Sequence, residues 1–212
     1  MKGIFKKLFG SSKPVVTVVS GLPRSGTSMM MKMLEAGGIP PLTDKIRTAD
    51  DDNPKGYYEF ERVKQMDKGD TAWMADAEGK TVKVISQLLR YMPAEHEYKV
   101  IFMRRNMSEI LASQKKMLIN RGEDPDQASD EEISALFEKH LNSVMDWMAA
   151  RPNVSVMYVH YSDMLANPMP QVALINEFLG GNMDVQAMAE VVDPNLYRNR
   201  KNRLKTDQSA SK

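Results

Sequence analysis

The sequence of 212 residues predicts an α/β fold in three layers, with a central, mainly parallel sheet flanked by helices. Two observations predict this class. Short apolar, β-branched runs alternate along the chain with longer segments of helical periodicity, which is typical of parallel sheets covered on both faces. The first apolar run also leads directly into a turn rich in glycine and serine, and then into a helical pattern. That strand–turn–helix order is typical of loops that bind phosphate groups.

The predicted elements follow in order along the chain. Strands are expected at residues 14–20, 81–85, 98–103 and 154–159. The first of them, PVVTVVS, is a continuous apolar run that suits a central strand buried on both faces. Helices are expected from the turn to residue 34, and over residues 59–77, 107–119, 130–149 and 168–179. Gly37 and Gly38 end the first helix, and Ser129 with Glu132 forms a capping box for the helix at 130–149.

The composition excludes several classes of protein. The chain has no cysteine, which excludes disulfide scaffolds, zinc–thiolate sites, iron–sulfur clusters and cysteine nucleophiles. Its net charge of +1 argues against nucleic acid as a partner. No apolar run reaches the roughly 18 residues of a membrane span, so a cytoplasmic protein is expected.

Basic residues concentrate at both ends of the chain. Residues 1–13 form a basic, amphipathic N-terminal segment, residues 14–200 the expected domain, and residues 201–212 a polar, basic tail. The N-terminal segment has two interpretations that stay open. It is either a weak contact with a membrane surface, or a terminus that is loosely ordered or packed on the domain as a helix.

Residues 21–28, with the sequence GLPRSGTS, form the predicted phosphate-binding loop. Gly21 and Gly26 free the turn sterically, and its serine and threonine side chains add hydroxyl donors. The spacing matches the GxxxxGK[ST] pattern of nucleotide triphosphatases, which predicts a P-loop fold, but Thr27 stands where that pattern has its lysine. A cation lies instead inside the loop, at Arg24. The absence of the lysine and the presence of an arginine inside the loop favour an anion shorter than a triphosphate. A nucleotide kinase or triphosphatase, and a turn with a purely structural role, stay open as alternatives.

The same segment resembles the 5′-phosphosulfate loop of the sulfotransferases, and the chain is similar to small, single-domain bacterial members of that family. These enzymes transfer a sulfuryl group from 3′-phosphoadenosine-5′-phosphosulfate (PAPS) to an alcohol or amine and release adenosine 3′,5′-bisphosphate (PAP). The resemblance implies that Arg24 binds the phosphosulfate and stabilises the charged bridging oxygen. It also implies that Ser25, Gly26, Thr27 and Ser28 hold the 5′-phosphate. Sulfuryl transfer needs no metal ion, so none is expected.

A second motif has the spacing of the family's site for the 3′-phosphate. Arg105 follows the strand at 98–103, and Ser113 comes eight residues later in the next helix. An arginine offers two parallel donors to one phosphate, which suits this role. Two weaker similarities add Tyr161, which would lie near the adenine, and Arg198, which would fold back onto the 3′-phosphate. For Tyr161 the alternative is a strand that ends in a helix cap at Ser162 or Asp163.

Sulfuryl transfer also needs a general base for the acceptor group. The cytosolic branch of the family uses a histidine shortly after the second strand, but here an apolar residue takes that position after Lys83. Other branches use a carboxylate, and the best candidate is Glu59. The alternative for Glu59 is a first-turn glutamate that complements a helix dipole. Lys83 could contact the transferred group or be a surface residue, and Asp50–Asp52 are expected to form a solvated turn.

The sequence therefore favours a sulfotransferase that uses PAPS, a cationic loop and a carboxylate base for in-line transfer to a hydroxyl or amine. Two alternatives belong to other classes: a P-loop nucleotide kinase or triphosphatase, and a non-catalytic nucleotide-binding or membrane-associated module. The acceptor can equally be a small metabolite, a carbohydrate or a lipid headgroup.

Overall fold

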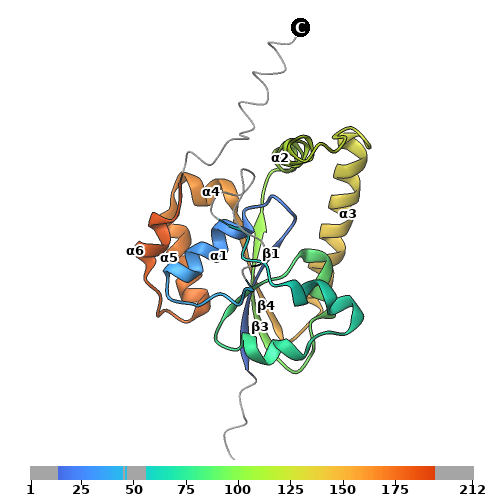
Figure 1. The fold of residues 1–212 in the computed structure, drawn as a ribbon. Helices are drawn as coiled ribbons and strands as arrows, with labels where there is room; N and C mark the ends of the chain where they lie inside the picture. Colours follow the sequence, from blue (N-terminus) through green and yellow to red (C-terminus); the bar gives the residue numbers. More distant parts are fainter. Residues whose placement is uncertain (1–13, 45, 47–55, 194–212) are drawn as a thin grey trace, which may run out of the picture.

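The computed structural model describes residues 14–44, 46 and 56–193. Its centre is a sheet of four parallel strands in the order β2-β1-β3-β4 (Figure 1). The strands are β1 (Val15–Gly21), β2 (Thr81–Lys83), β3 (Glu97–Arg104) and β4 (Val154–His160). Because β1 and β3 lie in the middle of the sheet, their apolar residues are buried on both faces.

Helices cover both faces of this sheet (Figure 1). The α-helices are α1 (Thr27–Ala36), α2 (Met107–Asn120), α3 (Asp130–Ala149), α4 (Tyr161–Ala166), α5 (Pro168–Leu179) and α6 (Val185–Glu190). Three segments are 3₁₀-helical: η2 (Glu61–Lys68), η3 (Ala72–Ala77) and η4 (Ser86–Tyr91). Among the described residues, no helix has both the length and the apolar character needed to cross a membrane.

Two apolar cores fill the space between the layers, one on each face. Val16 and Val18 of β1 belong to the core that packs against the 3₁₀ segments and α3. Val19 belongs to the core that packs against α1, α5 and α6. This alternation follows from the two-residue period of a strand. Because all four strands run parallel, their carboxyl ends, where the predicted loop lies, are at one edge of the sheet.

The structure confirms the predicted three-layer α/β class and changes some of its elements. The capping box at Ser129 and Glu132 is present, and α1 ends at Gly37 as predicted. The single helix predicted over residues 59–77 is wrong. Gly69 takes a left-handed φ of +89° and its N–H bonds back to the preceding turn, so η2 ends there and η3 starts separately.

Candidate active site

The turn between β1 and α1 has an unusual backbone. The φ angle is +148° at Gly21, +68° at Arg24 and +101° at Gly26. Positive φ is uncommon outside glycine, so Arg24 is held in a costly conformation. Gly26 is also the N-cap residue of α1, and no side chain caps this helix. The first-turn amides of an uncapped helix attract anions.

Two buried hydroxyl groups beside this turn give an independent sign of a ligand. Ser20 and Ser25 are both 0% exposed, and neither Oγ atom has a hydrogen-bond partner among the described residues. A buried polar group without a partner is costly and rare in a folded protein. Hydroxyl donors suit phosphate oxygens, so the turn fits the phosphate of the predicted donor.

The structure brings the two predicted phosphate motifs into contact. The Nε atom of Arg24 donates a hydrogen bond to Ser113 Oγ over 2.8 Å. The Nη1 atom of Arg105 donates to the main-chain oxygen of Arg24 over 2.9 Å. These pairs are 89 and 81 residues apart in the sequence. The parallel pairing of β1 with β3 explains the contact, because both motifs follow the carboxyl ends of neighbouring strands.

Arg105 is held from three sides. In addition to the carbonyl of Arg24, its Nε atom lies 3.1 Å from Glu109 Oε2. The two side chains are only 9% and 4% exposed. The guanidinium carbon lies 4.5 Å from the centre of the Tyr161 ring, a cation–π contact. Glu109 was not singled out from the sequence, although it lies only four residues after Arg105, at the start of the predicted helix.

Tyr161 lies against the loop as well as against Arg105. A Cβ atom added at Gly26 would approach Tyr161 Cδ2 to 2.5 Å. Burial raises the pKa of the Tyr161 phenol, and the nearby Arg105 opposes this rise. The strand does pass directly into a helix here, as the alternative for Tyr161 supposed, but the N-cap of α4 is His160 and not Ser162 or Asp163.

The Gly26→Ala variant is expected to be markedly less stable than the wild type. The left-handed φ costs an alanine about 1–2 kcal/mol, and the contact with Tyr161 adds about 1–3 kcal/mol of overpacking. Gly38→Ala is a matched control, because Gly38 has a φ of +102° and nothing within 4 Å of an added Cβ. Urea denaturation measures both losses. Equal losses for the two variants would show that the contact with Tyr161 carries no energy.

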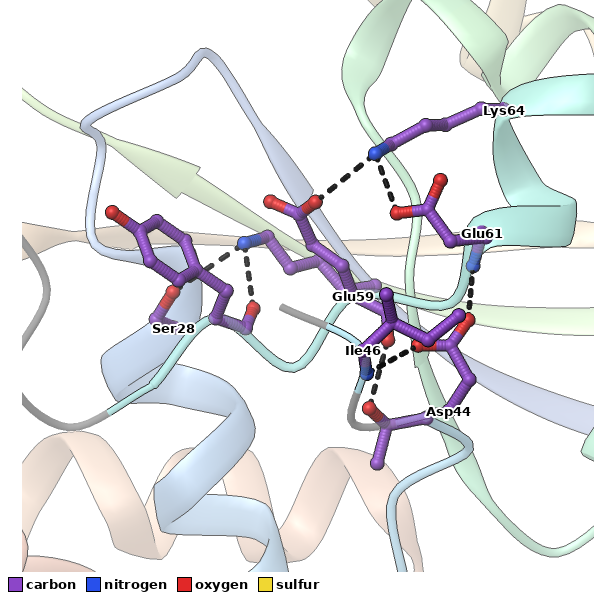
Figure 2. A network of polar contacts seen from close by, with 9 residues as sticks. Ser28, Asp44, Ile46, Glu59, Glu61 and Lys64 are labelled. Carbon is purple, nitrogen blue, oxygen red and sulfur yellow. Dashed lines mark hydrogen bonds and ion pairs between the residues drawn. The ribbon is translucent and has the colours of Figure 1, made fainter. Parts of the chain in front are cut away.

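Lys83 connects β2 to the start of α1. Its Nζ atom donates to the main-chain oxygen of Tyr57 over 2.9 Å and lies 3.4 Å from Ser28 Oγ. These contacts belong to the network of polar contacts drawn in Figure 2, where Ser28 and Glu59 are labelled. Lys83 is the last residue of β2 and is partly buried between the phosphate-binding helix and this loop.

Glu59 belongs to the same network (Figure 2). Its carboxylate lies 3.3 Å from Lys64 Nζ, its side chain is 18% exposed, and its carbonyl oxygen accepts a hydrogen bond from Thr43 Oγ1 over 2.7 Å. The alternative role as a first-turn glutamate is wrong. The segment η2 begins at Glu61, and Glu61 is the acidic residue of its first turn.

The remaining predicted positions divide into two groups. Thr27 begins α1, where its backbone belongs to the uncapped first turn. Arg198, the segment at residues 1–13, the tail at residues 201–212 and the turn at Asp50–Asp52 lie outside the described residues.

The chain belongs to the sulfotransferase domain family, whose sequence profile matches residues 15–212. The fold is similar to that of sulfotransferase STF1 from Mycobacterium tuberculosis H37Rv, with a TM-score of 0.54 and 15% identity over 84% of this chain and 70% of that protein. It is also similar to mouse sulfotransferase SULT7A1, crystallised with PAP, with a TM-score of 0.52 and 16% identity over 86% of this chain and 64% of the mouse chain. The alignment thus spans less than two thirds of the mouse enzyme. No curated protein sequence matches this chain significantly.

These comparisons confirm the predicted family and enzyme class. Sulfotransferases transfer sulfuryl groups from PAPS, so the kinase and non-catalytic alternatives are set aside. At 15–16% identity, the solved structures show a shared fold alone.

Proposed function

We propose that this chain transfers the sulfuryl group of PAPS to a hydroxyl or amine group by in-line displacement. The observation that carries the proposal is the contact between the two phosphate motifs through Arg24, Arg105 and Ser113. Two adjacent cationic sites, each with its own hydroxyl group, fit a ligand with two separate phosphate groups. A single triphosphate chain fits them less well, and Thr27 replaces the lysine that such a chain requires.

The loop would hold the 5′ end of the donor. The first-turn amides of α1 and the buried Ser25 hydroxyl can donate to the 5′-phosphate, together with Ser28. Arg24 would stabilise the negative charge that grows on the bridging oxygen as the bond to sulfur breaks. Lys83 supports this role, because its ammonium group lies beside Ser28.

The second motif would hold the 3′-phosphate. Arg105 and Ser113 supply a guanidinium group and a hydroxyl group at the same edge of the sheet. Glu109 and Tyr161 fix the orientation of Arg105 through an ion pair and a ring contact. Tyr161 would lie near the adenine, and Arg198 would be a further ligand of the 3′-phosphate.

Glu59 would act as the general base. A hydroxyl or amine acceptor must lose a proton as its oxygen or nitrogen bonds to sulfur, and a carboxylate at the site can accept that proton. Glu59 is the candidate because it lies two residues from Tyr57, whose carbonyl oxygen is held by Lys83 beside the phosphate-binding helix. The bond between sulfur and the bridging oxygen breaks on the opposite side, where Arg24 receives the developing charge.

Binding of PAP tests the donor assignment directly. We expect PAP to raise the melting temperature of the protein, while ATP with Mg²⁺ raises it much less. At one hundred times its dissociation constant, a ligand specific for the folded state adds about 2.7 kcal/mol of stability. Differential scanning fluorimetry with both nucleotides measures this. No shift at saturating PAP would contradict the proposal, and an equal shift with ATP would favour a triphosphate site.

The acceptor is proposed to be a small metabolite, a carbohydrate or a lipid headgroup. A panel of phenols, sugars, amino sugars and glycerol-based headgroups, incubated with ³⁵S-labelled PAPS, would show which class receives the label. Comparing the amount of PAP released with the amount of labelled acceptor formed in the same reactions separates transfer to the acceptor from transfer to water.

A further inference from the structure

Tyr58 has a strained backbone in the loop that carries two groups of the site. Its φ angle is +53°. Among the described residues other than glycine, only Tyr58 and Arg24 of the phosphate loop have a positive φ. A bulky aromatic residue in this region is a true outlier, and such strain persists only where surrounding contacts impose it. The contacts that hold Tyr58 therefore indicate what this loop must do.

Two contacts hold Tyr58 against α1. Its hydroxyl group donates a short hydrogen bond of 2.5 Å to Glu35 Oε2. Its partly buried ring packs against the core to which α1 contributes. Burial raises the pKa of the Tyr58 phenol, and the hydrogen bond to Glu35 raises it further. The phenol consequently stays protonated and remains a donor at physiological pH.

The residues on either side of Tyr58 contact the groups assigned to the reaction. The carbonyl oxygen of Tyr57 accepts the hydrogen bond from Lys83. Glu59, on the other side, pairs with Lys64 and is fixed through its carbonyl oxygen. A rotation of the backbone at Tyr58 would therefore displace both the Lys83 contact and the carboxylate.

Glu35 lies on the helix that begins at the phosphate-binding turn. It comes seven positions after Ser28, which corresponds to about 10 Å along an α-helix. The contact between Tyr58 and Glu35 is thus remote from the reacting groups. Its effect can reach them only through the loop of residues 57–59 and through α1.

We propose that Tyr58 and Glu35 are positioning residues for sulfuryl transfer. Their hydrogen bond fixes residues 57–59 against α1 and so keeps the side chains of Lys83 and Glu59 in a constant position relative to the phosphate-binding turn. This inference rests on the proposed function, because it takes Glu59 and Lys83 as the groups to be positioned. The hydrogen bond is charge-assisted, the stronger class of such bonds, which suits a contact that must resist backbone strain.

The variants Tyr58→Phe and Glu35→Gln test this proposal. Tyr58→Phe keeps the ring and removes the donor, while Glu35→Gln keeps an oxygen that can accept the bond. We expect hydrogen exchange of the amides in residues 56–60 to become faster in Tyr58→Phe. The rate of PAP release at saturating PAPS, measured with the best acceptor of the panel, should fall about tenfold. The melting shift caused by PAP should stay unchanged, and Glu35→Gln should retain most of the rate.

Tyr91→Phe serves as the control, because Tyr91 is an exposed tyrosine of η4, outside residues 56–60. An unchanged rate of hydrogen exchange over residues 56–60 in Tyr58→Phe would overturn the proposal that this hydrogen bond fixes the loop against α1. Faster exchange with an unchanged rate of PAP release would overturn the positioning role. If the wild type binds PAP but releases none from PAPS with any acceptor, the proposed function fails. The exchange measurement still decides whether the hydrogen bond holds the loop.

Discussion

Glu59→Gln is expected to lose sulfuryl transfer while keeping the bound nucleotide. A glutamine has nearly the same shape, and its amide oxygen can still accept from Lys64, so the local structure should persist. It cannot accept the proton of the acceptor group, however. General-base catalysis typically contributes about 10²–10⁴-fold, so kcat should fall by that factor. The rate of PAP release from PAPS measures the loss, and the melting shift with PAP measures retained binding.

Glu61→Gln is a suitable control for this variant. Glu61 pairs with the same lysine over 2.7 Å, but it lies in η2 and has a more exposed side chain. Loss of this second ion pair should leave transfer nearly intact, because exposed pairs contribute little to stability. Full activity in Glu59→Gln would identify another group as the base. An equal loss in both variants would point to Lys64 rather than to either carboxylate.

The sheet could be predicted because its signal is local. The runs that became β1 and β3 are continuous and apolar, as strands buried on both faces must be. The segment at residues 59–77 misled the prediction for an equally physical reason. Its apolar residues, such as Val63, Met66 and Trp73, are buried at helical spacing, but Gly69 interrupts the backbone that periodicity alone suggests is continuous.

The site could be predicted only in part. The phosphate loop has a recognisable sequence, and the spacing from Arg105 to Ser113 was readable without a structure. The partners of these groups were not, because they depend on which elements the fold brings together. The hydrogen bond from Tyr58 to Glu35 and the contact of Lys83 with the Tyr57 carbonyl join segments 23 and 26 residues apart. No pattern within one segment indicates such pairs.

Arg105→Ala is expected to abolish the melting shift caused by PAP and also to destabilise the protein. The shift should disappear because the guanidinium group is the proposed ligand of the 3′-phosphate. The stability should fall because Glu109, whose side chain is 4% exposed, loses its cationic partner. Removing one partner of a buried ion pair typically costs about 3–5 kcal/mol. Urea denaturation and fluorimetry with PAP measure the two effects separately.

The double variant Arg105→Ala/Glu109→Gln separates the structural role of Arg105 from its binding role. It removes the carboxylate charge that the single variant leaves buried, so most of the lost stability should return. PAP binding should not return, because no guanidinium group faces the 3′-phosphate. Recovery of the melting shift together with stability would show that Arg105 serves only to neutralise the buried carboxylate of Glu109. Recovery of stability alone would assign Arg105 to the nucleotide, since the fold would then be sound and only the ligand contact would be missing.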